Sequence, residues 1–162
     1  PISSVFLTGC AAGGESGTPQ TQTSDNSSGE PAAALAVAHW VKGESVDVSS
    51  GVHVVEFWAT WCPPCLTSIP HLTELQEKYA DRGVNIIGVS DEKLATVEAF
   101  VKKMGDKMAY TVAIDAGATS KGYMSKYGIN GIPHAFVVKD GEVVWHGHPM
   151  AKLEAAIEDA LK

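Results

Sequence analysis

The order of apolar patterns along this chain predicts an α/β fold in which helices cover both faces of a central mixed sheet. Apolar runs typical of buried strands alternate with amphipathic runs of helical spacing, and strands joined through helices normally run parallel. Asp140-Gly141 separates two further apolar runs, which is the pattern of an antiparallel hairpin. The predicted element order is β-α-β-α-β-α-β-β-α.

Each expected element rests on a local signal. The elements in order are a short strand or hairpin at residues 40–48, the central strand at 52–58, a helix at 63–79, a buried strand at 84–90, a helix at 94–104, a short strand at 110–114, a helix at 118–127, hairpin strands at 134–138 and 142–146, and a final helix at 150–161. Pro63 suits the first turn of a helix, and Pro70 should bend it. Asp91 is the expected N-cap of the second helix, and Gly128 ends the third.

Composition divides the chain into three parts. Residues 11–38 hold no aromatic residue, Lys or Arg, so they predict a disordered tether. Residues 39–162 have the apolar content of one folded domain, and residues 1–10 are considered below. The net charge of −7 comes without a basic cluster, which argues against a nucleic-acid surface.

Cys62 and Cys65 lie two residues apart where the central strand gives way to the first helix. Unpaired N–H groups and the macrodipole at a helix N-terminus favour a thiolate at Cys62. Cys65, one turn further in, is shielded and available to resolve a mixed disulfide. The pair predicts a centre for dithiol–disulfide exchange. The other interpretations are a structural disulfide or half of a zinc site, although the chain has no second CxxC pair.

The segment Glu56–Cys65 (EFWATWCPPC) resembles the active-site block of the thioredoxin superfamily, and within it of the TlpA/ResA-like membrane-tethered thiol-disulfide oxidoreductases. Pro70 falls where that family bends its first long helix. Gly131-Ile132-Pro133 matches the loop whose proline is cis in the family. The resemblance extends from about residue 40 to residue 162.

The resemblance implies the thioredoxin fold, with an additional α-β element inserted between Ser90 and Ile114. It also implies an extracytoplasmic protein-disulfide reductase without a diffusible cofactor. The expected partners are oxidised substrate proteins and a membrane thiol carrier that supplies electrons. We expect the protein to act as a monomer.

The third cysteine, Cys10, lies in a different context. Leu7-Thr8-Gly9-Cys10 resembles the lipobox of bacterial lipoproteins, and the apolar residues before it resemble the end of a signal peptide. No apolar run reaches the roughly 18–20 residues that a spanning helix requires. We therefore expect lipidation at Cys10, which would anchor the protein to a membrane on its periplasmic side.

Glu56 lies six residues before Cys62, where thioredoxins carry a buried aspartate. On the central strand its carboxyl group should lie beneath the cysteines, with a raised pKa, and accept the proton of Cys65. Glu56→Gln should then slow resolution of the mixed disulfide and spare the initial attack. The alternative is a partly exposed strand glutamate without a catalytic role.

Pro133 is the expected cis-proline facing the cysteines, and Ile132 before it should touch the substrate and the disulfide. The alternative is an ordinary proline at the start of a strand. Trp58 and Trp61 should wall the active site, with Trp61 at its exposed rim, although core packing explains Trp58 equally well.

Pro63 and Pro64, between the cysteines, are expected to contact the substrate together with Trp61 and Ile132. They also affect the redox potential of the pair. Each proline removes an N–H group that would otherwise stabilise the Cys62 thiolate. A less stabilised thiolate means a less stabilised reduced form and a more reducing couple. The two prolines therefore favour an electron donor over a strong oxidant.

Two alternative functions stay open. The first is an oxidant that introduces disulfides. The second is a module that binds or delivers copper through the CxxC pair and His134, His146 and His148. In the hairpin register expected from Asp140-Gly141, Ala135 faces His146 and His134 faces Gly147, which makes the histidines neighbours.

Overall fold

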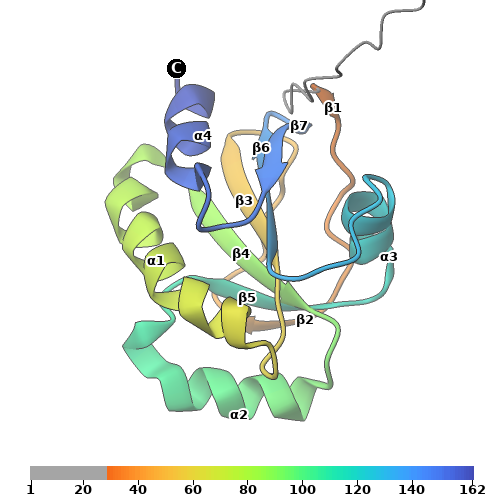
Figure 1. Cartoon of the computed structure of the whole chain (residues 1–162), viewed down its shortest axis with the longest axis vertical. Coiled ribbons are helices and arrows are strands. Elements are labelled where there is room, and N and C mark those ends of the chain that lie inside the picture. The colour runs from red at the N-terminus through yellow and green to blue at the C-terminus, as the bar shows by residue number, and fades with distance from the viewer. Residues whose placement is uncertain (1–28) are drawn as a thin grey trace, which may run out of the picture.

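The computed structural model describes residues 29–162 (Figure 1). Its elements are β1 (Glu30–Pro31), β2 (Val37–Lys42), β3 (Val52–Phe57), α1 (Pro63–Tyr79), η1 (Ala80–Arg82), β4 (Asn85–Ser90), α2 (Leu94–Met104), η2 (Gly105–Lys107), β5 (Thr111–Asp115), α3 (Ala118–Ser120), η3 (Lys121–Ser125), β6 (His134–Lys139), β7 (Glu142–Gly147) and α4 (Leu153–Ala160). None of the helices in this part of the chain is long and apolar enough to cross a membrane.

The strands form one mixed sheet of seven strands in the order β1-β7-β6-β3-β4-β5-β2. β3, β4 and β5 run parallel to one another, as the helical connections predict. β6 pairs antiparallel with β3, and β7 pairs antiparallel with β6. The predicted mixed α/β sheet is therefore confirmed, and β3 lies at its centre.

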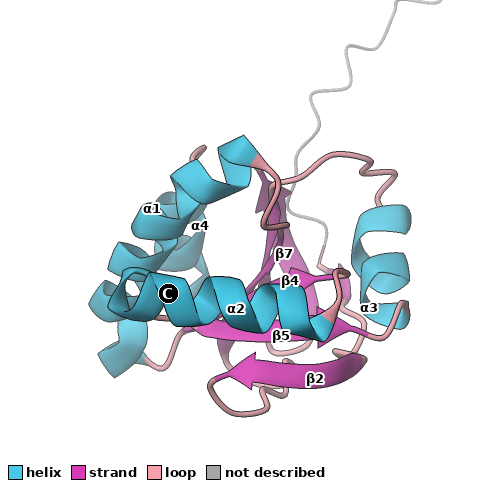
Figure 2. Ribbon diagram, turned by 90° about the horizontal axis from the view of Figure 1, so that it is seen from below, coloured by secondary structure: helices cyan, strands magenta, loops and turns pink. Residues whose placement is uncertain are grey.

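Helices cover both faces of the sheet (Figure 2). On one face, α1, α2 and α4 pack on side chains such as Val54, Ile86 and Val112. On the other face, the α3–η3 segment places Tyr123 and Met124 against Phe57 and other strand residues. Because β3 is covered on both sides, all six of its residues are buried, which explains its nearly continuous apolar sequence.

The N-terminal boundary predicted at residue 39 is wrong. Residues 30–38, assigned to a disordered tether, form β1, an irregular segment at 32–36 and the start of β2. Their main-chain groups form hydrogen bonds with residues far away in the sequence: Ala32 N–H donates to Gly141 O (2.7 Å), and the Tyr123 hydroxyl donates to Ala33 O (2.7 Å). Composition misses this because small residues held by main-chain hydrogen bonds leave little apolar signal. Cys10 and residues 11–28 lie outside the described residues.

Several element boundaries also differ. Residues 40–48 contain the end of one strand, β2, and no hairpin. α2 begins after Lys93, and Asp91 makes no capping bond to it. α4 begins only at Leu153, because the segment before it turns back on itself, with Ala151 N–H donating to His148 O (2.8 Å). α2 and β5 occupy the stretch where an inserted helix and strand were expected; that they are an insertion stays a prediction.

The hairpin is confirmed, but its register is not. Asp140 and Gly141 both have positive φ angles, of 48° and 79°, as a type I′ turn requires. A bulge between Val137 and Val138 then shifts the pairing by one residue. Ala135 faces Gly147 instead of His146, because β7 contributes one residue more than β6 at the bulge.

Candidate active site

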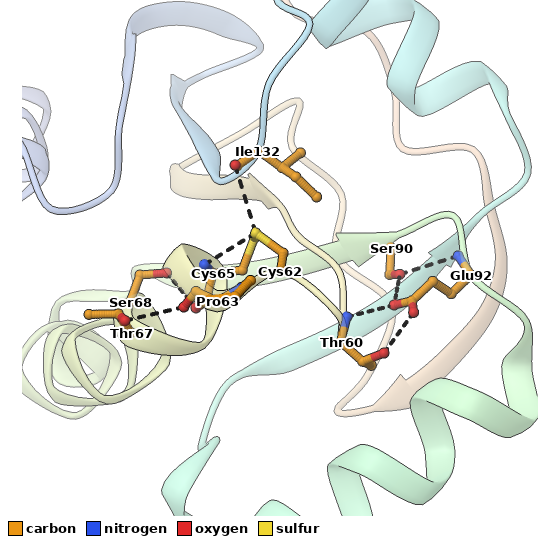
Figure 3. Close-up of a disulfide and its surroundings, with 9 residues drawn as sticks. All are labelled: Thr60, Cys62, Pro63, Cys65, Thr67, Ser68, Ser90, Glu92 and Ile132. Carbon is orange, nitrogen blue, oxygen red and sulfur yellow. Dashed lines mark hydrogen bonds between the residues drawn. A yellow bond between two sulfur atoms is a disulfide. The ribbon is translucent and has the colours of Figure 1, made fainter.

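The two cysteines lie at the N-terminus of α1 and form a disulfide, with Cα atoms 5.2 Å apart (Figure 3). Cys62 is the N-cap residue, as predicted, and its Sγ accepts a hydrogen bond from Cys65 N–H (3.3 Å). Cys62 is 3% exposed and Cys65 is fully buried. The outer sulfur is therefore the one closer to solvent, and the inner sulfur is screened by the fold.

Pro63 and Pro64 occupy the first two positions of α1. An N-cap side chain normally accepts hydrogen bonds from the N–H groups of the second or third helical residue. The second residue here is Pro64, which has no N–H group, so Cys65 N–H is the donor that remains for Cys62 Sγ. As the sequence predicts, the first two positions of α1 therefore offer no N–H group to Cys62 Sγ.

The cis-proline loop faces the cysteines. The Ile132–Pro133 peptide bond is cis, as the resemblance implied. The carbonyl oxygen of Ile132 lies 3.7 Å from Cys62 Sγ (Figure 3). In the disulfide this sulfur carries no proton, whereas the reduced thiol can donate to that oxygen. The contact places Ile132 beside the reacting sulfur, and its part in substrate binding stays a prediction.

A groove of about 270 Å³ runs beside the cysteines. Trp61 and Ile132 line it together with residues from the far side of the sheet, among them Asp115, Ser120 and Asn130. Trp61 is 70% exposed and forms the rim that the sequence predicts. Trp58 also lines the groove, but it is only 2% exposed and packs its ring on Phe100 of α2, with ring centroids 5.4 Å apart, so both expectations for it hold.

Glu56 is 1% exposed, on the face of the sheet that α1 covers. Burial raises its pKa to about 8, because removal from water disfavours the charged form. Neither carboxyl oxygen finds a hydrogen-bond partner among residues 29–162. The buried position and the raised pKa agree with the prediction for a proton acceptor, and its role in catalysis stays a prediction.

Glu92 fixes the loop that leads into Cys62, and sequence reasoning missed it. Its carboxylate accepts hydrogen bonds from Thr60 N–H (2.8 Å) and from the Thr60 hydroxyl (2.7 Å) (Figure 3). Ser90 Oγ donates to the same carboxylate (2.9 Å). One signal was available: Glu92 follows β4 at the carboxyl edge of the parallel strands, the edge at which the CxxC also lies.

His134 and His146 form a pair, with Nε2 of the first 3.0 Å from Nδ1 of the second. Burial, then the nearby His146 and His148, lower the pKa of His134 to about 4. The predicted proximity is therefore present despite the shifted register. Within residues 29–162, however, no group of three or more His, Cys, Asp or Glu side chains is arranged to hold a metal ion.

Known proteins match both the sequence and the fold. The Redoxin family model matches residues 28–161. The thiol-disulfide oxidoreductase ResA of Bacillus thuringiensis (strain Al Hakam) is 41% identical over 92 residues, which is 56% of this chain and 50% of that protein. ResA of Halalkalibacterium halodurans is 34% identical over 110 residues, 64% of this chain and 59% of that protein. The chain thus spans about half the length of the curated relatives it matches.

Solved structures agree with these sequence matches. A thiol:disulfide interchange protein of the thioredoxin family from Chlorobium tepidum TLS superposes with a TM-score of 0.66 at 26% identity, over 84% of this chain and 97% of that chain. The thioredoxin domain of a Bacteroides vulgatus oxidoreductase gives a TM-score of 0.69 at 24% identity, over 83% and 97%, and bears on the fold alone. A CxxC at a helix start, a facing cis-proline and a family match over most of the chain lead to one assignment: this chain is a member of the Redoxin family with the thioredoxin fold, and it is similar to ResA over about half of that protein's length.

Proposed function

We propose that this protein is an extracytoplasmic thiol-disulfide oxidoreductase that reduces disulfides in envelope proteins by cycling between the Cys62–Cys65 disulfide and the dithiol. The observation that carries the proposal is the buried disulfide at the start of α1, with its outer sulfur 3.7 Å from the cis-proline loop. Relatives named thiol-disulfide oxidoreductase support the same class of reaction.

The proposed cycle uses each cysteine once. The Cys62 thiolate attacks a substrate disulfide, forms a mixed disulfide and releases one substrate thiolate, which takes a proton from water. Cys65 then gives its proton to the Glu56 carboxylate, and its sulfur attacks Cys62 Sγ. The second substrate thiolate leaves and also takes a proton from water, so the substrate gains two electrons and two protons while the protein is oxidised.

Glu56 also suits the return step. A membrane thiol donor reduces the disulfide, and Cys65 departs as a thiolate that needs a proton. Because the pKa of Glu56 is raised to about 8, its carboxyl group is mostly protonated at neutral pH in the oxidised chain and can supply that proton. The donation leaves Glu56 as the carboxylate, which is the form that accepts the proton of Cys65 when a substrate is reduced. The proposed location is outside the cytoplasm, with the protein held to a membrane through lipid on Cys10. The resemblance of residues 1–10 to a lipoprotein signal supports this location.

The midpoint potential of the Cys62–Cys65 couple tests the direction of electron flow. We expect a value near or below about −220 mV after equilibration of the chain with defined thiol buffers, the range of thioredoxin and glutaredoxin. A value near about −120 mV, the range of DsbA, would instead identify the alternative oxidant. Cys62→Ser should abolish disulfide exchange, and Cys65→Ser should trap substrates as mixed disulfides.

A further inference from the structure

The groove beside the cysteines crosses the carboxyl ends of three neighbouring parallel strands. Phe57 is the last residue of β3, Val89 is the last but one of β4, and Asp115 is the last residue of β5. Ligands of open α/β sheets usually bind at this edge. Because Cys62 follows β3 and β4 lies between β3 and β5, the groove leads away from the reacting sulfur toward Asp115.

The deepest part of the groove is apolar. Phe57, Val89 and Met124 line it, and each of these side chains is less than a tenth exposed. Met124 lies in η3, a π-helical segment, and such segments are frequent at functional sites. Methionine also adapts its shape to different neighbours. This part of the groove therefore suits an apolar side chain of a bound polypeptide.

The charge of the groove has one sign. Among the lining residues within 29–162, Asp91 and Asp115 are the only charged side chains, and no Lys or Arg accompanies them. Asp91 is exposed, and its carboxylate forms no hydrogen bond or ion pair with any other residue in the described part of the chain. It is therefore available to a cationic partner.

Asp115, by contrast, is held in place. Its carboxylate accepts hydrogen bonds from the N–H groups of Gly117 (2.8 Å), Thr119 (3.1 Å) and Ser120 (2.9 Å). A carboxylate has about four acceptor positions, so one remains for a ligand. Asp115 is half-buried, and partly buried charges are screened less by salt than exposed ones. A cation in the groove thus meets one unpaired and one fixed carboxylate.

We propose, building on the function given above, that the groove binds substrate segments that carry Lys or Arg within about three residues of the disulfide cysteine. Two strand spacings separate β3 from β5, roughly 10 Å, which an extended chain covers in about three residues. Asp91 and Asp115 are then specificity-determining residues, and acidic segments are disfavoured by the same two carboxylates.

Reduction of matched peptides by the reduced chain tests this specificity. Each peptide holds one disulfide and differs from the others only in Lys, Gln or Glu two residues from a cysteine. Each rate is divided by the rate of dithiothreitol with the same peptide, which removes the effect of the added charge on the disulfide itself. We expect the order Lys, Gln, Glu, with Lys about tenfold faster than Glu at an ionic strength of about 0.01 M and little difference at about 1 M.

Variants of the two aspartates connect this preference to the groove. Asp91→Asn and Asp115→Asn should each lower the ratio of the Lys rate to the Glu rate about threefold. Asparagine at position 115 keeps an oxygen that can cap α3, so the fold is retained. Asp81→Asn is the matched control, because Asp81 is exposed in η1, beyond the end of α1 opposite to Cys62, and its ratio should stay unchanged. A Lys moved to six residues from the cysteine should lose its advantage.

Equal ratios in the unaltered chain and in both groove variants would overturn the proposal, as would faster reduction of the Glu peptide. A second readout needs no chemistry: peptides with serine in place of both cysteines are added to the oxidised chain. The Lys peptide should shift the NMR amide signals of Asp91 and Ser120 at lower concentration than the Glu peptide. Shifts that instead follow the concentration of the chain itself would identify a second copy as the occupant and overturn the proposal.

The two readouts fail separately. If the unaltered chain reduces all three peptides at one rate, the proposed function stands and the charge specificity is wrong. If it reduces none of them, the proposed function is wrong, and the serine peptides still decide whether the groove selects a basic segment.

Discussion

At the scale of single residues, Glu56 ties stability to pH. An unfolded chain holds a glutamate near pKa 4.3, whereas burial raises the pKa of Glu56 to about 8. Between those values the folded protein keeps a proton that the unfolded chain has released. The free energy of unfolding therefore falls as pH rises through this window, by up to about 1.4 kcal/mol per pH unit.

Glu56→Gln should remove this dependence. The amide has nearly the same shape and does not ionise, so the variant should gain stability over the unaltered chain at pH 8 and much less at pH 5. Denaturant unfolding of the oxidised proteins at both pH values measures the difference. Glu77→Gln, an exposed change on α1, is the matched control. Equal pH profiles for Glu56→Gln and the unaltered chain would contradict the raised pKa.

Glu92 acts on the loop before the cysteines. Its carboxylate holds both the amide and the hydroxyl of Thr60, two residues before Cys62. Glu92→Ala should destabilise the protein by about 1–3 kcal/mol, because hydrogen bonds to a charged acceptor are lost. It should also speed hydrogen exchange at the Thr60 amide.

Exchange measured residue by residue by NMR checks this prediction. Glu98→Ala, at an exposed position of α2, controls for the loss of one acidic residue. If the Thr60 amide exchanges at the same rate in Glu92→Ala and in the unaltered chain, Glu92 does not hold the loop.

At the scale of elements, the N-terminus of α1 sets the properties of Cys62. Pro64→Ala restores an N–H group at the second helical position, from which it can donate to Cys62 Sγ. The variant should lower the Cys62 pKa and make the couple more oxidising. Pro63→Ala is the matched control, since the first helical N–H does not usually reach the capping side chain.

Thiol titration of the two reduced variants, with their midpoint potentials, measures both effects. A larger shift in Pro63→Ala than in Pro64→Ala would show that the missing donor at the second position is not what limits the thiolate.

The elements also show which features of the fold local sequence patterns can predict. The CxxC at a helix start, the parallel strands and the Asp140-Gly141 turn are local signals, and the fold contains all three. The hairpin register was wrong because a bulge depends on packing across the sheet, which turn residues do not encode. Glu92 was missed for a related reason: its partner Thr60 lies 32 positions away, and the contact forms only when β3 and β4 align.

At the scale of the whole molecule, residues 30–38 form a strap that crosses the α3 side of the sheet (Figure 1). Its main chain bonds to the hairpin turn at Gly141, to Tyr123, and to Thr119 through Ala36 N–H (2.8 Å). The turn lies at the end of the sheet where β3 begins, and Cys62 follows the other end of β3. The strap is thus anchored far from the reacting sulfurs at its Gly141 end, whereas at its Ala36 end it is held by Thr119, the neighbour of the groove residue Ser120.

The strap's hydrogen bonds go to the hairpin turn, Tyr123 and Thr119 and not to the cysteines, which gives a prediction that distinguishes fold from chemistry. A chain of residues 39–162 should be less stable than one of residues 29–162 by several kcal/mol, because it loses the strap's hydrogen bonds and the packing of Leu35 and Val37. The midpoint potential of the cysteines should be unchanged. Denaturant unfolding and thiol-buffer equilibration of the two oxidised chains measure both quantities.

Two outcomes would contradict this picture in different ways. Equal stability would restore the domain boundary at residue 39, and the strap would then be an accessory to a core that folds without it. A shifted potential with lower stability would mean that the strap reaches the active site. The route for that effect is α3, whose Thr119 holds the strap and whose neighbour Ser120 lines the groove beside Trp61. Thr119→Val, which removes only the Ala36 bond, separates the two explanations: by itself it should lower stability and leave the potential unchanged.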